Sequence, residues 1–283
     1  MDKRSFRGHR DIQLVADVGG DPGAPAVLFS HGGGQTRASW GDAARALVAA
    51  GYHVISLDLR GHGESGWCPE GNYALEAYAE DLREVVAGLP MPPALVGASL
   101  GGLASLLAVG EGGVGAAALI MVDVTPRIDP GGAAKIAGFM RANPDGFASL
   151  EEAADAVSAY LPHRPRPRDL SGLRKNLRQG DDGRLYWHWD PGMLGTFRPD
   201  PTGMLDRFQA AAANVRVPTL LVRGSLSEIV TEDAAREFID AIPGCEYVDV
   251  TGAGHMVAGD RNNAFNDAVS GFLGRVHAPR RAI

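Results

Sequence analysis

The chain has 283 residues, enough for one large domain or for a domain with an insertion. Hydrophobic residues make up 45% of it and charged residues 22%, which is ordinary for a globular protein, and no apolar run approaches the ~20 residues that a membrane helix needs. The net charge of −7 argues against nucleic acid as a main partner. We therefore expect neither a nucleic-acid partner nor a membrane partner.

The first residues and the cysteines indicate a compartment. Basic residues occur near the N-terminus, but no apolar segment follows them, so we expect no secretory signal and a cytoplasmic protein by default. Cys68 and Cys245 are far apart and show no C-x-x-C or Cys/His metal spacing. We expect two free thiols, with no disulfide framework and no bound metal.

Short apolar runs bounded by turn residues alternate with longer segments of helical periodicity. This alternation predicts a mostly parallel sheet with helices on both faces, an α/β fold. The clearest predicted helix covers residues 74–89, whose apolar residues repeat on one face. The predicted strands are residues 12–18, 26–30, 53–59, 94–98, 117–124, 219–223 and 246–250.

The alternation stops after Val124. Residues 125–214 are rich in Pro, Arg, Asp and Trp, contain helical segments such as residues 150–161, and show no convincing strand. The α/β pattern resumes at Val217 and continues to a last helix near residues 263–275. We therefore predict one core, residues 1–124 and 215–283, with a helical cap, residues 125–214, inserted into it.

Ser99 lies in the segment Gly97-Ala98-Ser99-Leu100-Gly101, between a predicted strand and a helix-like segment. A serine at such a corner is exposed to a base and has free backbone N–H groups beside it. The flanking glycines allow the helix and the strand to approach closely and tolerate a strained backbone. Ser99 is therefore the predicted nucleophile.

A serine nucleophile needs a histidine as base and a carboxylate that orients the histidine. His255 lies in a glycine-rich loop after the last predicted strand and is the predicted base. Glu228 and Asp123 both follow strands, and the carboxyl ends of neighbouring parallel strands converge on one site. We favour Glu228 as the acid, with Asp123 as the alternative, because Asp123 could instead anchor the cap entrance through hydrogen bonds.

Two backbone N–H groups must hold the oxyanion of the reaction intermediate. Leu100 follows the nucleophile at a helix start, and Gly33 lies in the loop His31-Gly32-Gly33-Gly34 after a strand. These are the predicted donors, and His31 is expected to fix its loop through the ring. In the cap, we expect Trp187 or Trp189 to contact the substrate, although packing of the cap onto the core is an alternative role for each.

Four motifs together resemble the capped, single-domain branch of the α/β-hydrolase superfamily. The resemblance implies an α/β-hydrolase fold in which Ser99 is the nucleophile, His255 the base, and Glu228, after the penultimate core strand, the acid. The family more often has Asp at this acid position, which keeps Asp123 in contention. Members that open epoxides or carbon–halogen bonds carry Asp as the nucleophile, so Ser99 disfavours that chemistry. The motifs are Leu28-Phe29-Ser30-His31-Gly32-Gly33-Gly34, Leu57-Asp58-Leu59-Arg60-Gly61-His62-Gly63-Glu64-Ser65, Gly97-Ala98-Ser99-Leu100-Gly101-Gly102 and Gly252-Ala253-Gly254-His255.

The predicted function is hydrolysis of a carboxylic ester or a lactone through an acyl-enzyme, with no metal or organic cofactor. The expected substrate is an apolar molecule of small to medium size, because the cap encloses the site. The same serine, histidine and carboxylate also serve carbon–carbon bond hydrolysis and perhydrolysis, which differ in pocket detail. A ligand-binding signalling protein that turns over slowly or not at all is the alternative from another class. The oligomeric state stays open.

Overall fold

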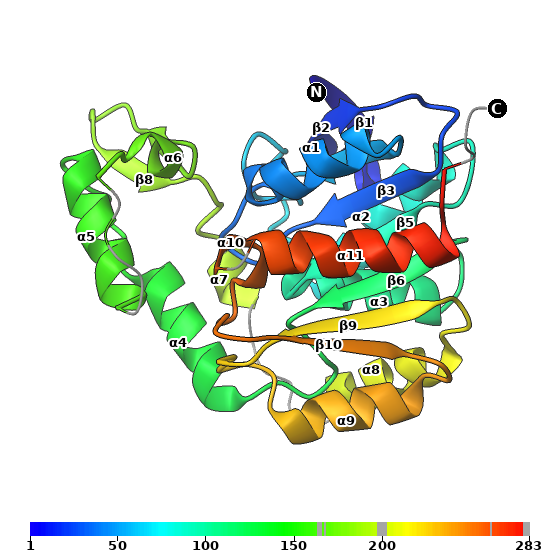
Figure 1. Ribbon diagram of the computed structural model, residues 1–283. Coiled ribbons are helices and arrows are strands. Elements are labelled where there is room, and N and C mark those ends of the chain that lie inside the picture. The colour runs from blue at the N-terminus through cyan, green and yellow to red at the C-terminus, as the bar shows by residue number, and fades with distance from the viewer. Residues whose placement is uncertain (163–165, 167, 197–202, 261, 280–283) are drawn as a thin grey trace.

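A computed structural model describes residues 1–162, 166, 168–196, 203–260 and 262–279 of the chain. An eight-stranded sheet lies at its centre, in the order β1-β2-β4-β3-β5-β6-β9-β10 (Figure 1). The strands from β4 to β10 pair in parallel, whereas β2 is antiparallel to both β1 and β4. The prediction of a mostly parallel sheet is confirmed. The strands are β1 (Asp2–Arg7), β2 (Gln13–Gly19), β3 (Ala26–Ser30), β4 (His53–Leu57), β5 (Ala94–Ala98), β6 (Ala118–Val122), β9 (Thr219–Gly224) and β10 (Glu246–Val250).

All the predicted strands occur in the sheet, and β3, β5 and β10 have the predicted bounds. These strands could be recognised because a strand covered on both faces is apolar at nearly every position. The first strand, β1, was not predicted. It lies at the edge of the sheet, and five of its six residues are exposed, so its sequence carries no burial pattern.

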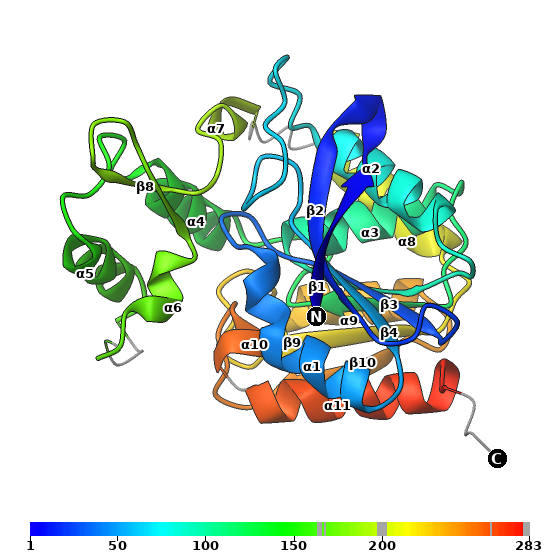
Figure 2. The same cartoon turned by 90° about the horizontal axis from the view of Figure 1, so that it is seen from above.

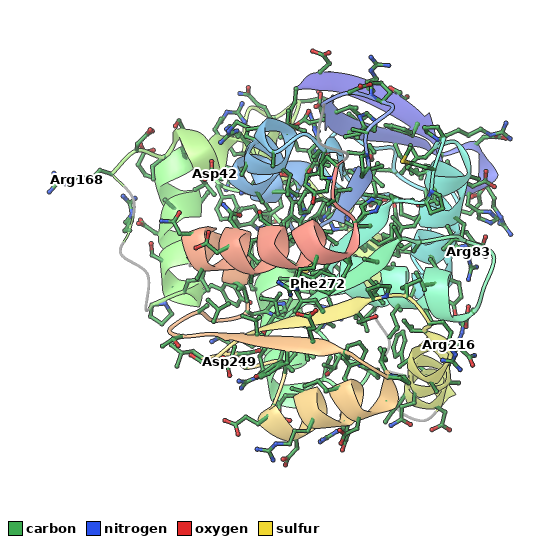
Figure 3. The ribbon with its side chains drawn as sticks, turned by 45° about the vertical axis from the view of Figure 1, so that its right-hand side comes forward. Asp42, Arg83, Arg168, Arg216, Asp249 and Phe272 are labelled. Atoms are coloured by element: carbon green, nitrogen blue, oxygen red, sulfur yellow. The ribbon has the colours of Figure 1, made fainter. Side chains whose placement is uncertain are left out.

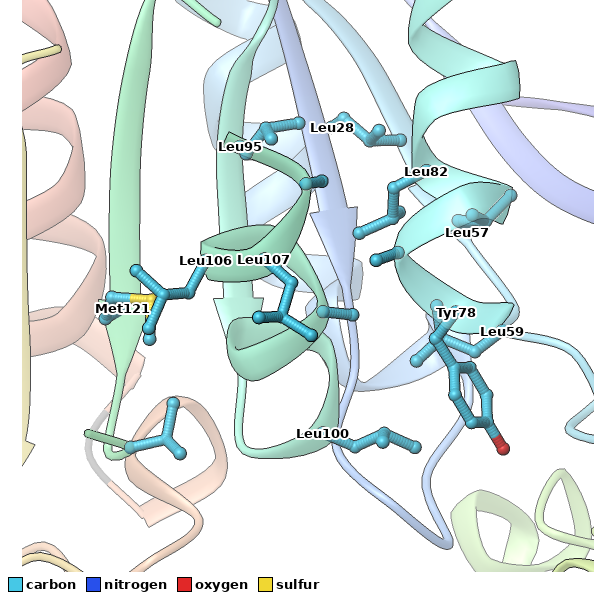
Figure 4. Close-up of a cluster of buried hydrophobic side chains, with 14 of the residues drawn as sticks. Leu28, Leu57, Leu59, Tyr78, Leu82, Leu95, Leu100, Leu106, Leu107 and Met121 are labelled. Carbon is cyan, nitrogen blue, oxygen red and sulfur yellow. The ribbon is translucent and has the colours of Figure 1, made fainter. Parts of the chain in front are cut away.

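Helices cover both faces of the sheet. One face packs against α1 and α11, and Phe272 of α11 is buried there (Figure 3). On the other face, leucines from the strands pack against leucines of α2 and α3 and form a second apolar layer of the core (Figure 4). The helices of the core are α1 (Gly41–Ala49), α2 (Leu75–Ala87), α3 (Leu100–Gly110), α8 (Gly203–Asn214), α9 (Glu232–Ala241), α10 (Val257–Asp260) and α11 (Asn262–Val276), with 3-10 turns η1 (His9–Asp11) and η2 (Arg37–Trp40).

The described residues between β6 and α8 include a part, residues 130–160 and 171–187, that projects from one side of the molecule, at the left of Figure 1, and Figure 2 shows the same separation from above. The segment between β6 and α8 is mainly helical but also contains the antiparallel pair β7–β8, which the sequence analysis missed. Three-residue strands are too short to show an alternating pattern. The elements are α4 (Pro130–Arg141), α5 (Leu150–Tyr160), α6 (Ser171–Arg174), β7 (Leu177–Gln179), β8 (Leu185–Trp187) and α7 (Met193–Thr196).

Helix α8 was predicted as part of the cap, but it packs on the core helix α3. The backbones touch closely: a Cβ added to Gly110 would lie 2.2 Å from the carbonyl oxygen of Ala211. The apolar residues Phe208, Ala211 and Ala212 of α8 are buried in the same layer as α3. Residues 203–214, which were predicted to end the cap, therefore lie against the core helix α3.

Within the described part of the chain, no helix is long and apolar enough to cross a membrane. Cys68 and Cys245 are both free thiols. Burial raises the pKa of the Cys245 thiol to about 11, which keeps it protonated and poorly nucleophilic.

Candidate active site

Ser99 occupies the sharp turn between β5 and α3. Its backbone has φ +46° and ψ −114°, a conformation that costs a non-glycine residue on the order of 1–3 kcal/mol. The turn depends on its glycines: a Cβ on Gly97 would lie 2.5 Å from the oxygen of Gly101, and one on Gly101 would lie 2.4 Å from the oxygen of Ser30. The close packing around the two glycines holds the strained serine at the carboxyl end of β5.

Asp123 follows the neighbouring strand at the same edge of the sheet. Ala98 pairs in register with Val122, and the N–H of Ser99 donates to the Val122 oxygen at 3.3 Å. Ser99 and Asp123 therefore stand one residue beyond the ends of two adjacent parallel strands. Asp123 also has a positive φ of +48°, and its side chain is 0% exposed.

The buried carboxylate of Asp123 is in contact with His255. The distance from His255 Nδ1 to Asp123 Oδ2 is 2.8 Å, and the imidazole is 19% exposed. Asp123 Oδ1 accepts the N–H of Gly224 at 2.9 Å, and Ser227 Oγ lies 2.6 Å from Oδ2. Because a carboxylate only accepts, Nδ1 carries the proton in this contact, which leaves Nε2 of the neutral imidazole as its basic atom.

The structure places Glu228, the favoured candidate for the acid, away from His255. Its side chain is 60% exposed and both carboxylate oxygens bond to Lys135 Nζ of α4, at 2.9 and 2.7 Å. The loop after β9 turns back at once, since the N–H of Ser227 donates to the Gly224 oxygen. Ser227 consequently faces Asp123, and the next residue, Glu228, faces the cap. The contact expected for Glu228 is made by the alternative, Asp123.

The oxyanion-loop residues named from the sequence lie beside Ser99. A Cβ on Gly32 would be 3.3 Å from the Ser99 Cβ. The N–H groups of Gly32 and Gly34 are occupied, by Gln35 Oε1 at 3.2 Å and His62 Nε2 at 3.1 Å. Among the described residues, the N–H groups of Gly33 and Leu100 have no acceptor. The two N–H groups that the sequence analysis selected as donors are therefore free to bind a ligand.

Three buried histidines connect the glycine loop at residues 32–34 to the segment between β6 and α8. The His31 ring lies between the Gly32 oxygen at 2.8 Å and the Leu59 N–H at 3.0 Å, which fits the expected anchoring role. His62 holds Gly34, and His188 of the cap accepts the Gly63 N–H at 2.8 Å. Adjacent ring centroids are 4.9 and 5.9 Å apart. The loop beside Ser99 is therefore held by neutral imidazoles, each of which needs an unprotonated nitrogen as acceptor.

Burial lowers the pKa of these histidines: to about 3 for His31, to about 4 for His188, and well below the ordinary value for His62. In the unfolded chain they titrate near pH ~6.5. The unfolded state therefore binds more protons below that pH, and acid destabilises the fold. We expect the melting temperature to fall between pH 6.5 and 5, where ordinary carboxylates are still ionised.

Circular dichroism melts across this range test the expectation. His188→Gln keeps an oxygen acceptor for the Gly63 N–H but removes one titrating group, so its melting temperature should fall less steeply than that of the wild type. A wild-type melting temperature that stays constant from pH 6.5 to 5 would contradict the neutral, buried state of the three rings.

Met140 and Trp189, from the segment between β6 and α8, lie against the glycine loop at Gly34. A Cβ on Gly34 would lie 3.3 Å from Trp189 Cζ3 and 3.5 Å from Met140 Cε. Trp187 stacks behind Trp189, with ring centroids 5.0 Å apart and planes 11° from parallel. Of the two tryptophans selected from the sequence, Trp189 is thus the one beside the loop. Met140 was missed because a single methionine in a cap helix carries no recognisable signal.

Comparisons with known proteins identify the family to which this chain belongs. The model of the alpha/beta hydrolase family matches residues 27–268. Esterase Rv0045c of Mycobacterium tuberculosis is 33% identical over 260 residues, which cover 88% of this chain and 83% of the esterase. A solved structure of that esterase superimposes with a TM-score of 0.76 at 27% identity, over 96% of this chain and 91% of the other.

A solved alpha/beta hydrolase from Novosphingobium aromaticivorans gives a TM-score of 0.81 at 25% identity and covers 97% of this chain and 98% of its own. The family match includes the turn at Ser99 and extends through the loop that carries His255. The predictions of the fold and of a hydrolase are confirmed: the chain belongs to the alpha/beta hydrolase family.

Proposed function

We propose that this protein hydrolyses carboxylic esters or lactones, with Ser99 as nucleophile, His255 as base and Asp123 as the orienting acid. The observation that carries the proposal is the 2.8 Å contact between His255 Nδ1 and the buried Asp123 carboxylate, beside the strained turn at Ser99. The similarity to an esterase supports the choice of bond.

In the first half of the reaction, Ser99 Oγ attacks the carbonyl carbon and its proton passes to His255 Nε2. The ionised Asp123, shielded from water, stabilises the imidazolium that forms. The N–H groups of Gly33 and Leu100 donate to the oxyanion, and Leu100 adds the positive end of the α3 dipole. His255 then gives the proton to the leaving alcohol, and the acyl group stays on Ser99.

In the second half, His255 takes a proton from water and the resulting nucleophile attacks the acyl-enzyme. The oxyanion again accepts from Gly33 and Leu100. Collapse of this intermediate returns the proton to Ser99 Oγ and releases the carboxylic acid.

A substrate panel tests the proposal. We expect p-nitrophenyl acetate and butyrate to give a burst of p-nitrophenol, and a fluorophosphonate to label Ser99, as located by mass spectrometry of the tryptic peptide. Lactones and a 1,3-diketone in the same panel separate ester hydrolysis from carbon–carbon bond hydrolysis. Ligand binding without turnover and without labelling would favour the signalling alternative and refute the proposal.

Met140 and Trp189 are proposed to form the apolar wall against which the substrate packs above the oxyanion loop. Met140→Ala removes part of this wall, and we expect it to shift kcat/KM in favour of longer acyl chains by about 10-fold, since one methylene in an apolar pocket changes selectivity by that order. Met140→Leu preserves the side-chain volume and serves as the matched control. An acetate-to-octanoate preference that is unchanged in Met140→Ala would exclude Met140 from the pocket.

A further inference from the structure

Ser227 contacts the proposed acid from the loop that follows β9. Its Oγ lies 2.6 Å from Asp123 Oδ2. The same Oγ accepts the backbone N–H groups of Ile229 at 3.1 Å and Val230 at 3.0 Å. The hydroxyl therefore has three hydrogen-bond partners of known type: two donors and a carboxylate.

These partners fix the direction of the hydroxyl proton. A serine hydroxyl has one proton and two lone pairs. The N–H groups of Ile229 and Val230 fill the lone pairs, so the proton is donated to Asp123. A bond from a neutral donor to an ionised acceptor is stronger and more directional than a bond between neutral groups.

The Ser227 hydroxyl donates to the same oxygen of Asp123 that contacts His255. Asp123 Oδ2 receives both the Ser227 hydroxyl and His255 Nδ1, while Oδ1 is held by the Gly224 N–H. The carboxylate is thus fixed at both oxygens and cannot rotate without losing a donor. Gly224 and Ser227 belong to one turn, closed by the bond from the Ser227 N–H to the Gly224 oxygen.

We infer that Ser227 is a positioning residue, which orients the Asp123 carboxylate so that His255 presents Nε2 to Ser99. The inference rests on the proposed function, because it assigns Asp123 to the catalytic unit. It also assigns a role to the loop after β9, in which the sequence analysis had placed the acid, Glu228.

Three variants test the inference. Ser227→Ala removes the hydroxyl, and we expect kcat for p-nitrophenyl butyrate to fall by about 10- to 100-fold while KM changes by less than about threefold. Ser227→Thr restores the hydroxyl and should recover most of kcat. Ser225→Ala is the matched control, because in the described part of the chain Ser225 Oγ accepts the Gly252 N–H, at 2.8 Å, and makes no hydrogen bond with Asp123.

A double-mutant cycle distinguishes positioning from general support of the loop. In an Asp123→Asn background, the charged acceptor is gone, so Ser227→Ala should cause little further loss of the Ser99 labelling rate by a fluorophosphonate. An equal loss in both backgrounds would show that Ser227 acts only through the loop and would overturn the inference. So would an unchanged kcat in Ser227→Ala.

Failure of the proposed function would look different. In that case the wild type itself would neither turn over the esters nor react at Ser99 with the fluorophosphonate, and the cycle would have no starting activity. A wild type that is active and labelled, with Ser225→Ala as impaired as Ser227→Ala, would leave the proposed function intact and reject the assignment to Ser227.

Discussion

Ser99→Ala is expected to lower kcat for a p-nitrophenyl ester by about 10⁶-fold and to abolish labelling by a fluorophosphonate. The loss is large because the serine, the histidine and the carboxylate act as one unit: without the hydroxyl, the His255–Asp123 pair has no nucleophile to activate. Steady-state kinetics and mass spectrometry of the labelled peptide measure both effects. Loss of labelling without loss of turnover would place the nucleophile elsewhere.

Ser99→Gly provides a control that separates activity from folding. Both variants lack the nucleophile, but glycine adopts φ +46° without the steric cost that serine and alanine incur. The melting temperature of Ser99→Gly should therefore exceed that of Ser99→Ala, by a margin that corresponds to about 1 kcal/mol. Such a result would show that the turn stores strain for the sake of function. Equal melting temperatures would argue that the turn is relaxed.

Asp123→Asn is expected to lower kcat by about 10⁴-fold, whereas Glu228→Gln should stay within about threefold of the wild type. The asparagine keeps the shape of the side chain but can no longer stabilise the imidazolium or enforce the tautomer with the proton on Nδ1. Glu228 loses only an exposed ion pair with Lys135, which contributes little in water. Both substitutions remove one negative charge, so they are matched.

The opposite pattern, with a large loss in Glu228→Gln and little loss in Asp123→Asn, would return the acid to the loop after β9. A circular dichroism melt of each variant accompanies the kinetics, because Asp123 also accepts the Gly224 N–H and its replacement can lower stability. A loss of kcat at a temperature well below the melting point of the variant is then attributable to chemistry.

The elements that could be predicted closely are those whose environment is uniform. Strands such as β3 and β5 are buried at nearly every position, so their whole sequence is apolar. Edge strand β1 lacks such a pattern because five of its six residues are exposed. Strands β7 and β8 lack it because each has only three residues. Helix α8 was assigned to the cap because its burial depends on α3, a contact that its own periodicity does not identify.

By itself, the sequence determined the class of the fold, the strand-to-helix turn at Ser99, the histidine loop and the glycine-rich loop, because glycine spacing and buried apolar runs are local properties. Only the tertiary structure shows which of the two carboxylates contacts His255: Asp123 does, whereas Glu228 pairs with Lys135. Both residues follow strands at the same edge of the sheet. The turn after β9, closed by the bond from the Ser227 N–H to the Gly224 oxygen, directs Ser227 toward Asp123 and Glu228 toward Lys135. That direction is set by backbone hydrogen bonds, which every residue type except proline can donate.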